Sequence, residues 1–120
     1  MSDTKRSHLH YFEDIIHSID KIESYVFDIT YDEFCQSPMI VDAVIRNFEI
    51  IGEAANKIPS EERDKYKQVE WRQIIGFRNV LIHDYFEVDI EAVWDTIEKN
   101  IPILKKHIQH AYESEKQSTS

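Results

Sequence analysis

The stretch Phe77–Phe86 places side chains suited to acid–base and phosphate chemistry close together around an apolar run. Its His83 could, as a neutral imidazole, take the proton of a ribose 2′-hydroxyl, whose oxygen then attacks the adjacent phosphate. Arg78 carries a permanently charged guanidinium, which could bind that phosphate and stabilise the charge that develops in the transition state. Asn79 adds a hydrogen-bond donor, and Tyr85 adds a phenol. These residue types suit cleavage of RNA without a metal.

The spacing of Arg78 and His83 limits how the two side chains could act on one group. Five residues apart on an ideal helix, they point roughly 140° away from each other. They would meet only if the helix ends near His83, or if another helix or subunit completes a cleft. Tyr85 would return to the arginine's face if the helix continued.

The same residues also have structural interpretations. The macrodipole favours a histidine at the C-terminus of a helix, and a tyrosine often lies at the rim of a core. On spacing alone, an amphipathic helix with a polar end is the more common explanation of such a stretch.

The composition indicates one globular domain. The chain has 120 residues, of which 42% are hydrophobic and 31% are charged, and it contains only two glycines and three prolines. A chain of this length forms a single core. Its longest apolar runs are too short for a membrane span or a signal peptide. The lone Cys35 fits a reducing compartment, so we expect a cytoplasmic protein without a membrane partner.

Apolar residues recur at spacings of three and four along the chain, which predicts an all-α fold. We expect an up-down bundle of four principal helices plus short helical segments over residues 1–112, and a disordered polar tail over 113–120. The principal helices should cover about residues 3–27, residues 38–57, a segment from Trp71 past Leu81, and a segment from Asp89 to Ile108.

Local signals mark the ends of these helices. Thr30 and Glu33 predict a capping box, and Ser37 followed by Pro38 predicts a helix start. Asp89 is expected to cap the last principal helix, and Pro102 should kink it.

Two glycines, Gly52 and Gly76, fall inside predicted helices, where each costs about 1 kcal/mol relative to alanine. We therefore expect another helix or a ligand to approach the backbone closely at these positions.

The net charge of −9 argues against a polyanionic partner, but its distribution is uneven. Residues 63–83 carry five basic and two acidic side chains, whereas the segments on both sides are acidic. The basic segment leads into the Arg78 motif, so it could form a groove for phosphate; ordinary solvated surface is the alternative.

Longer blocks around the motif resemble those of a known family. "AVIRNFEIIGEAANKIP" (Ala43–Pro59), "WRQIIGFRNVLIHDYFEVD" (Trp71–Asp89) and "VWDTIEKNIPIL" (Val93–Leu104) are similar to successive blocks of HEPN-domain ribonuclease toxins of the HepT type. "RNVLIHDY" matches their R-x4-H-x-Y pattern. The resemblance covers about residues 8–108.

This resemblance implies a helical homodimer whose two motif copies face one cleft and cleave RNA without a metal or other cofactor. It implies that Arg78 and His83 are catalytic, that Asn79 is the supporting polar residue, and that Tyr85 is a modification site. In such systems the partner is a minimal nucleotidyltransferase antitoxin, which transfers AMP to the motif tyrosine and neutralises the toxin.

Two other functions remain open at this stage. The domain could be a non-catalytic binding module that partners a nucleotidyltransferase, because residues suited to cleaving a phosphodiester also suit binding one. It could also be a purely structural bundle. No metal site is expected, because Asp14-x-x-His17 lacks the second such pair that a carboxylate-bridged site in a bundle needs.

Overall fold

The computed structural model describes residues 2–83 and 88–119, with side chains from residue 8 to residue 118 within those ranges. These ranges contain helices and no strand, which confirms the predicted all-α fold. The helices are α1 (Ser2–Val26), α2 (Tyr31–Cys35), α3 (Pro38–Lys57), α4 (Ser60–Asp64), α5 (Trp71–His83), α6 (Ile90–Lys99) and α7 (Ile101–Thr119).

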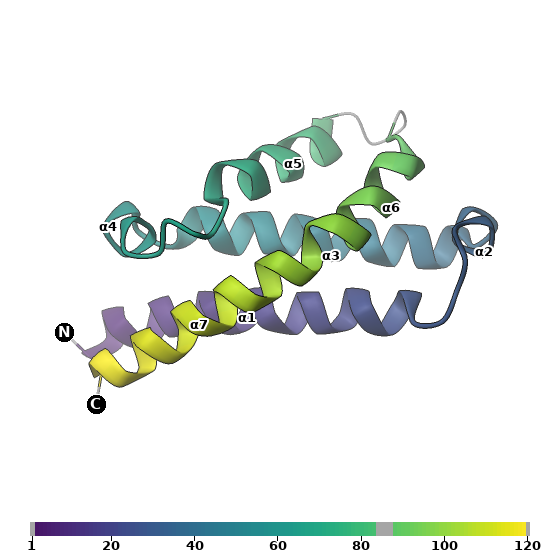
Figure 1. Cartoon of the computed structure of the whole chain (residues 1–120). Coiled ribbons are helices and arrows are strands. Elements are labelled where there is room, and N and C mark those ends of the chain that lie inside the picture. The colour runs from purple at the N-terminus through teal and green to yellow at the C-terminus, as the bar shows by residue number, and fades with distance from the viewer. Residues whose placement is uncertain (1, 84–87, 120) are drawn as a thin grey trace.

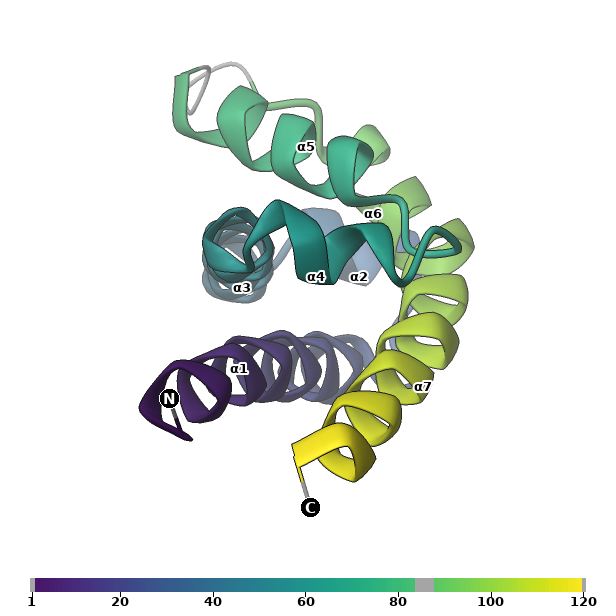
Figure 2. The same ribbon diagram turned by 90° about the vertical axis from the view of Figure 1, so that its left-hand side faces the viewer.

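Helix α3 lies in the middle of the molecule. α1 packs along one side of α3 and α5 packs along the other, while α7 runs obliquely across α1 (Figure 1). Viewed end-on, α1, α3 and α5 form a stack that α7 flanks on one side (Figure 2). The central position of α3 makes it the platform on which the motif helix α5 rests.

The predicted apolar stripes form the core. On α1, the side chains of Phe12, Ile15 and Ile19 have no exposed surface, and on α3 those of Val44 and Ala55 have none. Fully burying one large apolar side chain stabilises the fold by about 1.5–3 kcal/mol. The α1–α3 pair therefore supplies much of the stability.

The junction between α1 and α3 follows the predicted signals with one difference. Thr30 Oγ1 accepts from the Glu33 amide at 3.1 Å, and Glu33 Oε1 accepts from the Thr30 amide at 2.8 Å, which confirms the capping box. Pro38 is the first residue of α3, as predicted. The Ser37 side chain does not cap α3, because its hydroxyl donates to the Glu33 carbonyl at 2.8 Å.

The last predicted helix is two helices. Asp89 Oδ1 accepts from the amides of Glu91 and Ala92, so the predicted cap of α6 is confirmed. α6 ends at Lys99 and α7 begins at Ile101, with Asn100 between them. The expected kink at Pro102 is therefore a break just before it, which fits the donor that proline removes from the first turn.

The prediction of a disordered tail at residues 113–120 is wrong for the described part of that segment. α7 continues to Thr119, and Glu115 is buried. Tyr66 donates its phenol proton to Glu115 Oε2 at 3.0 Å. A buried hydrogen bond to another part of the fold holds these last turns, and no local pattern in the polar sequence indicates it.

Burial and a hydrogen bond with Glu62 raise the pKa of the Glu115 carboxyl. Hydrogen bonds with Glu115 and then Lys65 lower the pKa of Glu62 to about 2. The pKa values of the two carboxyls thus shift in opposite directions, and their contact joins α7 to α4.

None of the described helices is both long enough and apolar enough to cross a membrane.

Candidate active site

Helix α5, which carries the motif, is fixed at its start and along one face. The Trp71 indole donates to the carbonyls of Arg63 and Tyr66, both at 3.1 Å. Phe77 packs edge-on against Phe48 of α3, with ring centroids 5.1 Å apart. These contacts set both the position and the rotation of α5 on α3.

Helix α5 approaches α3 closely at Gly52, beneath Arg78. A Cβ added to Gly52 would lie 2.2 Å from the Arg78 Cβ and 2.8 Å from its Cγ. The same atom would lie 3.3 Å from the Ile74 carbonyl oxygen. The predicted close approach at this glycine is confirmed, and the helix that approaches is the motif helix itself.

The other glycine, Gly76, has no such neighbour. A Cβ added there would meet nothing within 4 Å, and the residue is exposed on the outer side of α5. No contact of the described chain explains a glycine at this position.

The Arg78 guanidinium lies among polar groups at the surface of the α3–α5 pair. Its Nη1 donates to Asn79 Oδ1 at 3.0 Å, and its Nη2 lies 3.9 Å from Glu53 Oε1. Its Nε is buried and has no hydrogen-bond partner in the described structure. The side chain as a whole is 29% exposed, so the arginine is half-buried while part of its charged end reaches solvent.

The same Glu53 oxygen lies 3.9 Å from Nη1 of Arg46. Arg46 also pairs at 3.4 Å with Glu49, which lies three residues further along the same helix. Glu53 therefore stands between two arginines, one from its own helix and one from α5. Sequence analysis did not single out Glu53.

His83 is the last residue of α5 and is exposed. Because the helix is continuous from Arg78 to His83, the two side chains diverge as the helical period predicts. No hydrogen bond or ion pair within the described part of the chain joins them. Tyr85 lies outside the described residues, so its predicted role is not tested by the structure.

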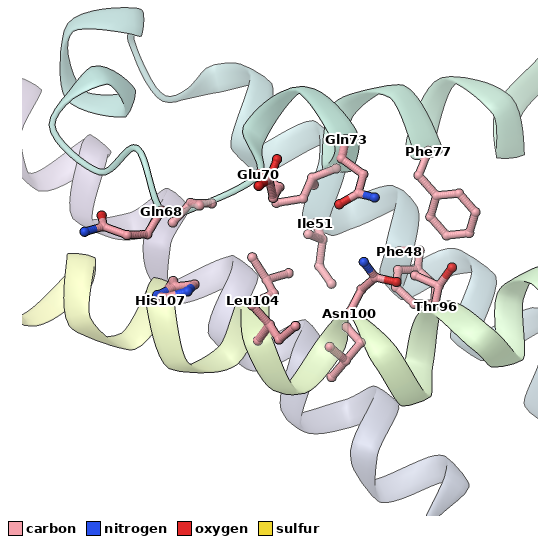
Figure 3. A pocket seen from close by; sticks show the side chains of 14 residues that line it. Phe48, Ile51, Gln68, Glu70, Gln73, Phe77, Thr96, Asn100, Leu104 and His107 are labelled. Carbon is pink, nitrogen blue, oxygen red and sulfur yellow. The ribbon is translucent and has the colours of Figure 1, made fainter.

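A groove lies on a different face of α5 (Figure 3). It has a volume of about 580 Å³ and runs between α5 and the α6–α7 arm, with Phe77 and Leu104 in its walls and the amides of Gln73 and Asn100 pointing into it. Neither Arg78 nor His83 lines it. This groove is therefore separate from Arg78 and His83.

The predicted basic segment 63–83 is divided between two parts of the fold. Lys65 pairs with Glu62 at 2.9 Å and lies 3.9 Å from Glu115, which belongs to the last turns of α7. Arg72 and Lys67 are exposed and have no ion pair among the described residues. Only part of the predicted positive segment can therefore accompany Arg78.

Among the described side chains, no group of three or more acidic, histidine or cysteine residues is arranged to hold a metal ion.

The fold and the motif helix together define a class: a small all-α domain of the HEPN type, with Arg-x4-His on a helix that packs by one face only. The model of the family described as "Ribonuclease HepT-like" matches residues 15–111. The chain belongs to the HepT-like ribonuclease family.

Named relatives agree with this assignment. A Thermococcus cleftensis protein named "Probable ribonuclease HepT" is 41% identical over 101 residues, which are 84% of this chain and 92% of that protein. A "Putative RNase" of Caldanaerobacter subterraneus is 38% identical over 106 residues, or 88% of this chain and 95% of the relative.

A longer relative contains only a corresponding part. "Gamma-glutamylcyclotransferase and putative RNase" of Methanocaldococcus jannaschii is 44% identical over 98 residues, which are 82% of this chain. The chain spans less than half of that relative, 44% of its length. No solved structure matches the chain.

Proposed function

We propose that this protein is a metal-independent endoribonuclease and that it acts in the cytoplasm as the toxin of a two-component system. One observation carries the proposal: in a chain of the HepT-like ribonuclease family, Arg78 is seated on α3 with part of its guanidinium at the surface, and His83 is exposed on the same helix. A positioned cation and an accessible base are what phosphodiester cleavage by the 2′-hydroxyl requires.

In the proposed reaction, the His83 imidazole accepts the proton of a ribose 2′-hydroxyl. The 2′-oxygen forms a bond to phosphorus while the bond from phosphorus to the 5′-oxygen breaks, which leaves a 2′,3′-cyclic phosphate and, after protonation of the leaving oxygen, a 5′-hydroxyl. Arg78 binds a non-bridging phosphate oxygen and stabilises the negative charge that builds on it. Asn79, which accepts from Arg78, helps to hold the guanidinium.

The test is cleavage of RNA by the purified protein in EDTA, with the ends of the products identified. Arg78→Ala and His83→Ala should each abolish cleavage and growth arrest, while His17→Ala, at an exposed histidine on α1, should change neither. If His83→Ala cleaves as fast as the parent, the assignment is wrong. If the parent binds RNA or nucleotide but never cleaves, the protein is a binding module instead.

We propose that the active form is a homodimer. Within one chain Arg78 and His83 diverge, so a second copy is needed to bring an arginine and a histidine to one phosphate. Exposed apolar side chains offer a contact: Val80 and Ile82 on α5 are 52% and 41% exposed, and Met39 is 86% exposed.

Light scattering should show a dimer at micromolar concentration. Ile82→Asp should produce a folded monomer with little cleavage activity, whereas Ile103→Asp, at an exposed position on α7, should remain dimeric. A monomer with full activity would contradict this part of the proposal.

We propose that a minimal nucleotidyltransferase antitoxin silences the enzyme by transferring AMP from ATP to Tyr85, with release of pyrophosphate. Tyr85 is two residues past His83 in the sequence. An adenylyl group there adds bulk and a negative phosphate close to the place where the phosphate of RNA must bind. Mass spectrometry after incubation with the nucleotidyltransferase, ATP and Mg²⁺ should show AMP increments that vanish in Tyr85→Phe. Modification of another tyrosine would refute the assignment of Tyr85.

A further inference from the structure

Two consecutive residues of α3, Gly52 and Glu53, contact opposite ends of the Arg78 side chain. Gly52 lies against the stem, where an added Cβ would be 2.2 Å from the Arg78 Cβ. The Arg78 Cβ is attached directly to the α5 backbone, so no rotation about a side-chain bond can relieve the clash. Any larger residue at position 52 would displace α5, and with it the starting point of the arginine side chain.

Glu53 lies near the charged end. Its Oε1 is 3.9 Å from Arg78 Nη2, which is within ion-pair range and beyond a hydrogen bond. The carboxylate therefore attracts the guanidinium without occupying its N–H groups. A group held in this way keeps donors for an incoming phosphate, which binds guanidinium strongly through paired hydrogen bonds.

Arg46 on the other side of Glu53 restrains the carboxylate in turn. Its Nη1 lies 3.9 Å from the same Glu53 oxygen. The Glu53 carboxylate therefore has a guanidinium on each side, and the Arg78 side chain meets α3 at both of its ends.

We propose that Gly52 and Glu53 are positioning residues for Arg78, and this inference rests on the ribonuclease function proposed above. Gly52 sets where the arginine stem leaves α5, and Glu53 sets where its guanidinium points. Neither residue touches the substrate. Their effect on the rate of the chemical step passes through Arg78.

This role makes a kinetic prediction that a merely structural role does not. Glu53→Gln removes one negative charge next to two arginines, so RNA should bind more tightly and KM should fall. The same substitution releases the guanidinium from its orientation, so kcat should fall, by up to about 10²-fold if the displacement approaches 1 Å. A loss of folding would lower activity without tightening the binding of RNA.

Glu49→Gln is the matched control. It removes the same charge from the same helix and from the same cluster, but among the described side chains Glu49 pairs with Arg46 and not with Arg78. It should lower KM like Glu53→Gln and leave kcat unchanged. If the two variants have equal kcat, the positioning role of Glu53 is refuted.

A double-mutant cycle separates action through Arg78 from direct action. In the Arg78→Ala background, where the residual rate is measured in a single-turnover assay, adding Glu53→Gln should cause no further fall in rate. An additive fall would overturn the proposal, because Glu53 would then act independently of the arginine.

A measurement that does not depend on cleavage activity completes the test. In ¹⁵N-labelled protein, the Nε–H signal of Arg78, assigned by its loss in Arg78→Ala, should show restricted motion that increases in Glu53→Gln and not in Glu49→Gln. Unchanged motion in Glu53→Gln would contradict the proposal. If the parent protein does not cleave RNA at all, the proposed function fails; if it cleaves and only the contrast between the Glu53 and Glu49 variants is missing, the positioning role alone fails.

Discussion

The helix pair α1–α3 and the motif helix α5 differ sharply in how much of their apolar surface the fold covers. Phe12, Ile15, Ile19 and Ile22 of α1 are fully buried, and α3 contributes nine buried residues. On α5 only Leu81 is buried, although the helix has 13 residues. The helix that carries the motif thus buries far fewer of its side chains than α3, on which it packs.

This difference separates stability from function. α5 is held through one face, by Phe77, Leu81 and the contact of Arg78 with Gly52, while its outer face with His83 stays open. A helix with one free face can present side chains to a substrate or a second subunit, which a helix buried on all sides cannot. Substitutions in the two regions should therefore affect different measurements.

The largest expected effect is on cleavage and comes from the motif helix. Arg78→Ala and His83→Ala should each lower the rate by about 10²–10⁴-fold, because in the proposed mechanism each removes a group that acts on the transition state. Neither should lower the melting temperature appreciably, since His83 is exposed and alanine keeps the Cβ of Arg78 that packs on Gly52. Calorimetry and a cleavage assay on the same samples would check both statements.

A core substitution should show the reverse. Phe12→Ala removes a fully buried ring that packs edge-on against Tyr66 and Trp71, with centroids 6.1 and 6.2 Å away. It should lower the free energy of unfolding by about 3–5 kcal/mol. Urea denaturation measures this loss, and cleavage per folded molecule at low temperature should be close to the parent value. If Phe12→Ala lowered cleavage per folded molecule, the separation of stability from function between the two regions would be contradicted.

The two glycines sharpen the comparison, because replacement of each by alanine should change the free energy of unfolding in opposite directions. Gly52→Ala should destabilise the protein by about 1–3 kcal/mol, because the added methyl overlaps the Arg78 stem. Gly76→Ala should stabilise the isolated chain by up to about 1 kcal/mol, because the methyl enters open space and helix propensity improves. Thermal unfolding at low protein concentration reports both, and equal shifts would refute the close approach at Gly52.

The smallest expected effect concerns pH and the end of α7. The folded pKa of Glu115 is raised above its ordinary value of 4.5, so its contribution to stability is present at lower pH and is lost as pH rises through the folded pKa. Glu62 has the opposite sign: its contribution is present above 4.5 and is lost as pH falls toward about 2.

Glu115→Gln should therefore remove the loss of stability that accompanies a rise in pH above 4.5 and leave the loss that accompanies a fall in pH toward about 2. Melting temperatures measured across pH would decline less as pH rises in Glu115→Gln, and Glu98→Gln, at an exposed position on α6, should keep the parent profile. An unchanged decline with rising pH in Glu115→Gln would show that the buried carboxyl does not control it.

The sequence was sufficient to predict features that depend on neighbours along the chain. Such features are the periodic apolar residues of α1 and α3, the Thr30–Glu33 capping box and the Asp89 cap. Each involves groups within a few residues of each other, so a local sequence pattern predicts it directly. The sequence also nominates Arg78 and His83 as catalytic residues, because their chemistry and spacing lie within one short stretch, and this role stays a prediction.

Only the tertiary structure decided which helices meet and which faces stay open. The approach of Arg78 to Gly52, the ion pair with Glu53, and the burial of Glu115 against Tyr66 join residues 25 to 49 positions apart. An apolar stripe indicates that a helix packs, but it does not indicate which helix is the partner. The polar sequence around Glu115 likewise does not indicate that the buried phenol of Tyr66 will contact it. The physical reason is that such contacts arise when two separately formed helices are brought together, and their energy depends on shape and charge at the contact rather than on any pattern within either helix.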